Sequence, residues 1–232
     1  MNGLLLVNGK FRWDMARNHY AVFGLGSFGA KLAVELGRAG NAVVVVDIDR
    51  ERVDELREKV TEAIIADVSN EEVVRELNVS KFDAVILGMS SHFEDQVLAL
   101  TLLKQEGARK VLAKANTAIQ ERILYRLGAD EVIQPEQDVA ERISRRLSMA
   151  NITDLFEFKG SAMAEVSVPG RMAGKSLRQL DLRNRSNVTV LLMHKPGCPT
   201  ETILSPDTLL EKGDQLTVFG SRESILKLFK ED

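Results

Sequence analysis

The sequence contains a single cysteine, Cys198, and no run of apolar residues near the ~20 needed to cross a bilayer. One cysteine excludes an internal disulfide bond and is typical of a reducing compartment. Without an apolar span, any role at a membrane has to come through a partner protein. We therefore expect a cytoplasmic protein.

An excess of positive charge is also missing. The chain has 31 Lys and Arg residues against 34 Asp and Glu residues, which gives a net charge of −3 at pH 7. This balance argues against a general nucleic-acid binder, and we expect no nucleic-acid partner. The 232 residues are 44% hydrophobic and 28% charged, which suits one large or two small globular domains.

Short apolar runs alternate with helical patterns through the first part of the chain. Such alternation is typical of an α/β domain with a doubly wound parallel sheet of the Rossmann-like kind. Strands of such a sheet are covered on both faces, so they appear as continuous apolar runs. The runs expected to be strands are 20–23, 42–47, 62–66, 82–88, 110–113 and 130–133.

The pattern changes after Pro135. Residues 138–149 form an amphipathic helix with Val139, Ile143 and Leu147 on one side, which either packs on a second subunit or folds back on its own sheet. Shorter alternating strands then predict a small α+β domain. The expected organisation is an N-terminal extension (1–18), a doubly wound domain (19–137), a helix and linker (138–158) and a C-terminal domain (159–232).

The glycine spacing after the first strand predicts a dinucleotide-binding loop. Gly24, Gly26 and Gly29 follow the G-x-G-x-x-G pattern directly before a helix. The first glycine allows the tight turn, the second lets the backbone approach phosphates, and the third lets the helix pack closely on the sheet. Asp47 ends the next strand, where a carboxylate can accept hydrogen bonds from ribose hydroxyls. The alternative is that the glycines only serve the turn.

Ligands of such sheets bind beyond the carboxyl ends of the strands. There, Asp67 is placed to reach an adenine amino group or to cap a helix, and Lys114 to meet a phosphate or to lie on the surface. We expect His92 to be solvated. The predicted nucleotide-binding residues are Gly24, Leu25, Gly26, Ser27, Phe28, Gly29, Asp47, Ile48, Asp49, Arg52, Asp67, Val68, Gly88, Met89, Ser90 and Lys114.

Several segments together resemble the regulatory subunits of Trk/Ktr potassium-uptake systems, which carry one RCK (KTN) domain and an RCK C-terminal (TrkA-C) domain. These segments include GLGSFG at 24–29, VDID at 46–49, GADEVIQPEQD at 128–138 and LEKGDQLTVFG at 210–220. The resemblance runs from Asn18 to the end. The single RCK unit is similar to the Ktr-type subunit.

The resemblance implies a homo-octameric cytoplasmic ring under a potassium-translocating membrane subunit, peripheral to the inner face of the cell membrane. It implies that ATP, ADP or NAD(H) in the crevice changes the shape of the ring, and that the helix after Pro135 crosses to a neighbouring subunit. It also implies a Mg²⁺ or Na⁺ ion held by Glu136. One position departs from the family, which often has Arg where this chain has Ser27.

The alternative function is that of an NAD-dependent oxidoreductase. That chemistry needs a general acid or base over the nicotinamide. Tyr20 and Tyr125 have no Lys four residues further on, so the Y-x-x-x-K arrangement of short-chain reductases is missing. We therefore expect a regulatory protein and no enzyme.

Overall fold

A computed structural model describes residues 17–89, 92–148, 151–195, 197 and 205–229. Most of the predicted N-terminal extension, the predicted site residue Ser90 and Cys198 lie outside these residues. The chain divides into two compact units after Glu136, and each is described by itself.

The first unit contains a six-stranded parallel sheet with the strand order β3-β2-β1-β4-β5-β6. This confirms the predicted doubly wound sheet, whose strand order reverses between β1 and β4. In strand β1, Tyr20 pairs with Val43 of β2 on one side and with Ala84 of β4 on the other. The strands are β1 (His19–Phe23), β2 (Ala42–Asp47), β3 (Glu62–Ile65), β4 (Ala84–Leu87), β5 (Val111–Lys114) and β6 (Glu131–Ile133).

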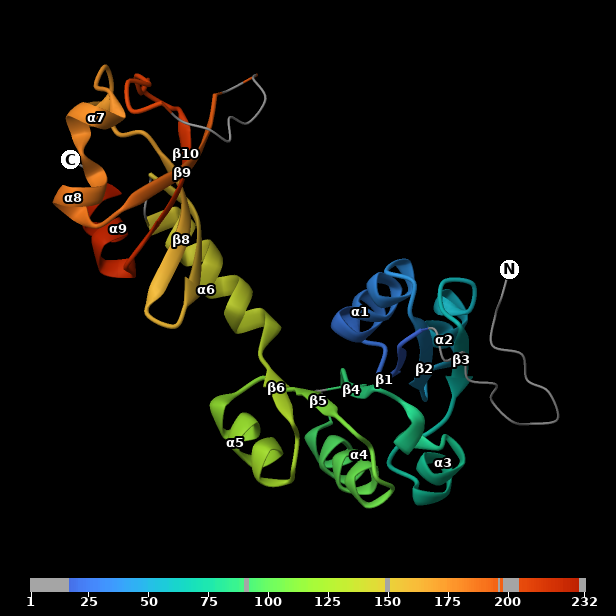
Figure 1. The fold of residues 1–232 in the computed structure, drawn as a ribbon. Helices are drawn as coiled ribbons and strands as arrows, with labels where there is room; N and C mark the ends of the chain where they lie inside the picture. The colour runs from blue at the N-terminus through green and yellow to red at the C-terminus, as the bar shows by residue number, and fades with distance from the viewer. Residues whose placement is uncertain (1–16, 90–91, 149–150, 196, 198–204, 230–232) are drawn as a thin grey trace. The chain divides into compact units, whose positions relative to one another are not determined.

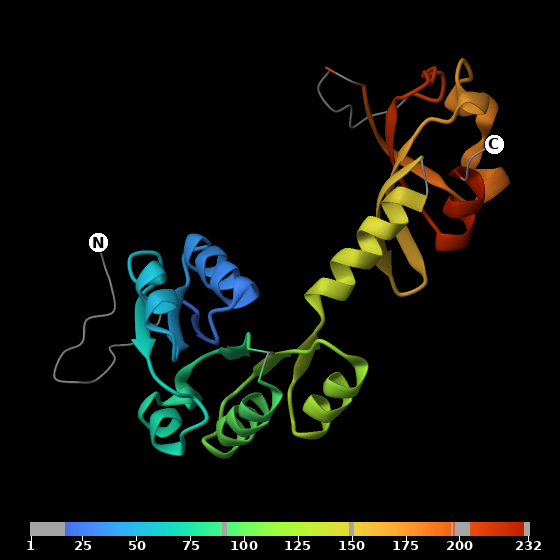
Figure 2. The same cartoon turned by 180° about the vertical axis from the view of Figure 1, so that it is seen from behind.

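Helices cover both faces of this sheet (Figures 1 and 2). Helices α1 and α2 lie against one face, and α3, α4 and α5 lie against the other. These helices are α1 (Ser27–Arg38), α2 (Arg50–Leu56), α3 (Glu71–Glu76), α4 (Phe93–Gln105) and α5 (Ala118–Arg126), and a 3₁₀ turn spans Val79–Lys81.

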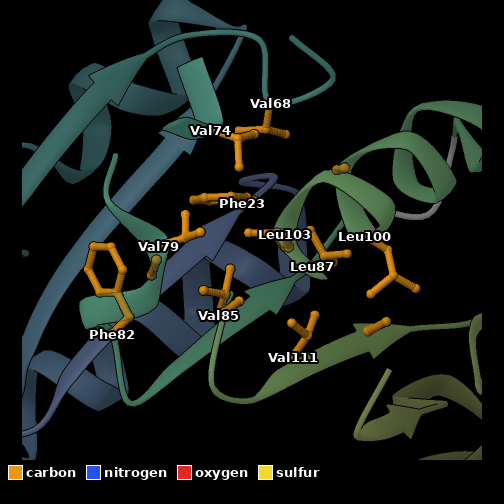
Figure 3. Close-up of a cluster of buried hydrophobic side chains, with 14 of the residues drawn as sticks. Phe23, Val68, Val74, Val79, Phe82, Val85, Leu87, Leu100, Leu103 and Val111 are labelled. Atoms are coloured by element: carbon orange, nitrogen blue, oxygen red, sulfur yellow. The ribbon is translucent and has the colours of Figure 1, made fainter. Parts of the chain in front are cut away.

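The double cover explains why the strands are apolar without alternation. Every residue of β2 is buried, although its side chains point alternately to the two faces. Figure 3 shows the core on the α4 side, where Phe23 and Leu87 of the sheet lie near Leu100 and Leu103 of α4. All four of these side chains are fully buried.

The second unit contains a four-stranded antiparallel sheet with the order β7-β8-β10-β9. This confirms the predicted small α+β domain. Its strands are β7 (Ile152–Phe158), β8 (Ser161–Ser167), β9 (Thr189–His194) and β10 (Gln215–Gly220). Its helices are α6 (Pro135–Ser148, which begins at the end of the first unit), α7 (Leu177–Leu180), α8 (Leu182–Ser186) and α9 (Arg222–Phe229), with a 3₁₀ turn at Gly170–Met172.

Two predicted boundaries around α6 are wrong. The helix begins at Pro135, three residues before the predicted start, because the first helical position needs no N–H donor and proline's fixed φ suits it. The predicted linker ends too late, because residues 152–158 form β7, which pairs with β8. From Glu136 onwards, every residue of helix α6 whose burial is described is exposed, including Val139, Ile143 and Leu147.

No helix in the described part of the chain is long and apolar enough to cross a membrane.

Candidate nucleotide-binding site

A cavity of about 420 Å³ lies at the carboxyl edge of the parallel sheet, where the strand order reverses. In this kind of sheet the reversal separates two loops and leaves room for a ligand between them. The cavity is lined by Gly24, Gly26, Ser27, Phe28, Val46, Asp47, Ile48, Asp49, Arg52, Ala66, Asp67, Val68, Gly88, Met89, His92, Asp95 and Lys114.

The structure therefore brings together all the predicted binding residues except three. Leu25 and Gly29 belong to the glycine loop but are buried and do not line the cavity, and Ser90 lies outside the described residues. The binding role of each remains a prediction. Four lining residues, Val46, Ala66, His92 and Asp95, were not among those predicted. Val46 is the second-last residue of β2 and Ala66 directly follows β3, while His92 is the N-cap of α4 and Asp95 lies in its first turn; these places at the carboxyl edge of the sheet were the available signal.

The glycines of the loop divide into packing positions and an open position. Gly24 has a φ of +88°, which favours glycine. A Cβ on Gly29 would lie 2.0 Å from the carbonyl oxygen of Gly24, so only hydrogen fits there. A Cβ on Gly26 would meet no atom within 4 Å. Gly26 therefore leaves space over the loop that the fold itself does not require.

The N-terminus of α1 opens on this space without a side-chain cap of its own. Its N-cap is Gly26, which makes no side-chain capping bond, and its first turn holds no acidic residue. The described helices α2, α3 and α5 are instead capped by the side chains of Asp49, Asn70 and Thr117. Free N–H groups and the helix dipole at this end favour an anion such as a phosphate.

Asp47 connects the second strand to the glycine loop. Its side chain is buried, and its Oδ2 accepts a hydrogen bond from the backbone N–H of Leu25 at 2.5 Å, while Oδ1 accepts one from Asp49 N–H at 2.9 Å. Arg52 lies 3.9 Å from the same carboxylate. An ionised carboxylate has about four acceptor positions, so Asp47 can still accept hydrogen bonds from the hydroxyl groups of a ligand. The sequence had not indicated that Asp47 also holds the loop.

Asp67 shapes the turn after β3. Its Oδ1 accepts hydrogen bonds from the hydroxyl and the backbone N–H of Ser69, at 2.7 and 2.9 Å, and these bonds lower the pKa of Asp67 below its ordinary value. The cap of α3 is Asn70, not Asp67. Asp67 lines the cavity and has a second oxygen for a ligand.

Lys114 ends β5 and is buried, which rules out the alternative of a surface lysine. Its Nζ lies 2.5 Å from Oε1 of Glu136, and this hydrogen bond lowers the pKa of Glu136. The described residues contain no group of three or more His, Cys, Asp or Glu side chains that could hold a metal ion. The ion at Glu136 therefore remains a prediction.

These features fit an adenine nucleotide. The open space over Gly26, the N-terminus of α1 and the Lys114 ammonium suit phosphates, and the Asp47 carboxylate suits ribose hydroxyls. The fold and the site thus define a nucleotide-binding doubly wound domain joined to a small antiparallel domain.

Comparison with known proteins identifies the family. Residues 20–135 match the TrkA-N domain and residues 163–231 match the TrkA-C domain. The chain belongs to the family of Trk/Ktr potassium-uptake regulatory proteins that carry these two domains. This confirms the resemblance predicted from the sequence motifs.

Individual relatives agree with this assignment. The chain is 36% identical to Ktr system potassium uptake protein A of Vibrio alginolyticus, over 91% of this chain and 96% of that protein. It is 30% identical to Ktr system potassium uptake protein C of Bacillus subtilis, over 92% and 97%. The fold resembles that of the GsuK channel bound to NAD, with a TM-score of 0.63 and 18% identity, over 98% of this chain but only 40% of the channel chain.

Proposed function

We propose that this protein is the nucleotide-sensing regulatory subunit of a potassium uptake system. The potassium role is supported by 36% identity to a Ktr system potassium uptake protein over nearly the whole of both chains. The sensing role is supported by the cavity at the reversal of the strand order. The relatives carry names of uptake proteins, which favours regulation over the alternative of an NAD-dependent oxidoreductase.

The ligand is an adenine nucleotide, ATP or ADP, or the dinucleotide NAD(H). Asp47 binds the ribose, the first turn of α1 and Lys114 bind phosphate, and Asp67 binds the adenine amino group. A solved structure with the same fold was determined with NAD, which supports a dinucleotide as well as a mononucleotide.

The test is calorimetry with ADP and NADH on the wild-type protein and on Gly26→Val. A Cβ at residue 26 meets no atom within 4 Å, and the valine side chain would occupy space over the loop, so we expect at least a tenfold loss of affinity, ~1.4 kcal/mol, in a protein that still folds. Gly170→Val is the matched control, because Gly170 also has open space around it and lies in the second unit. Equal affinity of wild type and Gly26→Val would refute this site.

The subunit assembles with copies of itself into a ring, an octamer in the proposed form, on the cytoplasmic side of a potassium-translocating membrane protein. Val139, Ile143 and Leu147 of α6 support self-association, because these apolar residues are 43%, 41% and 78% exposed. A Mg²⁺ or Na⁺ ion at Glu136 belongs to the same proposal, with phosphate oxygens completing its ligands.

Light scattering tests the assembly. Ile143→Asp would place an unpaired charge in the contact and should reduce the oligomer to smaller species. Gln137→Asp adds the same charge at a position of α6 away from the apolar stripe and should leave the oligomer intact. Co-purification of the wild-type protein with a potassium-translocating membrane protein tests the partner, and purification alone, without such a partner, would contradict it.

A further inference from the structure

One ion pair joins the cavity to the helix through which the chain passes from the first unit to the second. Lys114 lines the cavity at the end of β5, and Glu136 is the second residue of α6. The two residues are 22 positions apart, and they meet because Lys114 pairs with Ile133 of the neighbouring strand β6. The rest of α6 belongs to the second unit.

The two partners of this pair have very different access to water. The side chain of Lys114 is 9% exposed and that of Glu136 is 65% exposed. The other ion-paired lysines among the described residues range from 26% exposed, for Lys104, to 75%, for Lys31. Glu136 can therefore return to water at little cost, whereas the Lys114 ammonium needs an anion in place of it.

The backbone of Lys114 is fixed by a buried hydrogen bond from helix α4. Gln96 of α4 is fully buried, and its Nε2 donates a hydrogen bond to the carbonyl oxygen of Lys114 at 2.8 Å. Because the main chain is fixed there, Lys114 can change its partner only by turning its side chain. A phosphate in the cavity presents more negative charge than a carboxylate, and in a poorly solvated place that difference counts more.

We propose that, when no metal ion is bound at Glu136, Lys114 exchanges the Glu136 carboxylate for a phosphate oxygen on nucleotide binding, and that this exchange releases the first turn of α6. The pair then acts as a latch: it holds the start of α6 without phosphate and lets it loosen with phosphate. This inference rests on the proposed nucleotide site and adds how occupancy of that site is transmitted along the chain.

Calorimetry with ADP and with adenosine, in EDTA to remove divalent ions, tests the exchange. Glu136→Gln frees Lys114 beforehand, so affinity for ADP should rise about three- to tenfold, while affinity for adenosine stays constant. Lys114→Met should weaken ADP binding and leave adenosine binding unchanged. In the double variant, Glu136→Gln should no longer increase ADP affinity, since its effect acts through Lys114.

The matched control is the pair Lys110–Glu131, which joins β6 to the residue before β5 at 3.0 Å and does not line the cavity. Glu131→Gln should bind both probes as wild type does. Hydrogen exchange supplies a second readout. ADP should speed exchange of the backbone N–H groups of residues 137–141 in wild type but not in Glu136→Gln, where exchange is already fast.

The outcomes separate the two proposals. If wild type binds neither probe, the proposed nucleotide site is wrong and the latch falls with it. If wild type binds ADP but Glu136→Gln binds it equally or more weakly, or if ADP leaves exchange at 137–141 unchanged, the site stands and the latch is refuted.

Discussion

The six-stranded sheet of the first unit has helices on both faces, whereas the four-stranded sheet of the second unit buries one face and exposes aromatic side chains on the other. Ala162, Ala164 and Val218 point into the second core. Phe156 and Phe219, which both pair with Met163, are 52% and 41% exposed. With both faces covered, a ligand reaches the first sheet only at its edge, and the loops there carry the site.

The largest expected effect contrasts the two sheets directly. Phe23 of β1 is fully buried, so Phe23→Ala should cost ~3–5 kcal/mol of the free energy of unfolding. Phe219→Ala removes the same atoms from the open face of the second sheet and should cost less than ~1 kcal/mol. Thermal unfolding measures both. A similar cost for the two would break the comparison, because it would mean that the open face is covered in the assembled protein.

The next effect separates packing from ligand space within the glycine loop. Gly29→Ala forces a Cβ against the Gly24 carbonyl oxygen and should cost ~1–3 kcal/mol. Gly26→Ala should change stability by less than ~0.5 kcal/mol, because nothing lies within 4 Å of the added atom. Denaturant midpoints give the difference. Equal destabilisation would show that the loop needs both glycines for its own packing.

A third effect concerns charge at the same edge. Ser27 is exposed beside the cavity and carries no charge, so the wild-type protein should prefer ATP over ADP by less than about tenfold, ~1.4 kcal/mol. Ser27→Arg adds a planar cation that can hold a terminal phosphate, and it should raise that preference. Calorimetry with both nucleotides decides it. A strong ATP preference in wild type would place the discriminating charge elsewhere.

The smallest effect is the pH dependence of the Asp67 turn. The hydrogen bonds from Ser69 lower the pKa of Asp67 in the folded protein below its ordinary 3.8. The carboxylate therefore stabilises the fold above that pH, and the contribution disappears as the pH falls through the lowered pKa. Asp67→Asn should cost ~0.5 kcal/mol or less at pH 7, because the group is exposed, and nothing in strong acid. A constant difference between variant and wild type across this range would exclude the titration.

The order of elements in the first unit and the position of its site follow from the sequence because both depend on local patterns. Buried strands such as residues 42–47 are continuous apolar runs, which the sequence alone reveals. Gly24 and Gly26 follow one such run and Asp47 ends the next, so the sequence also places them at strand ends. The family could also be predicted from the sequence, because the motifs that indicate it, around the glycine loop and after Pro135, are contiguous stretches of residues.

Tertiary structure decided what depends on residues far apart in the chain. β7 was missed because its alternation is interrupted by an irregularity between Ile152 and Asp154, and only pairing with β8 makes it a strand. The hydrogen bond from Leu25 to Asp47 and the pair of Lys114 with Glu136 each join positions 22 residues apart. Such partners are chosen by the register of neighbouring strands, which a linear pattern does not contain.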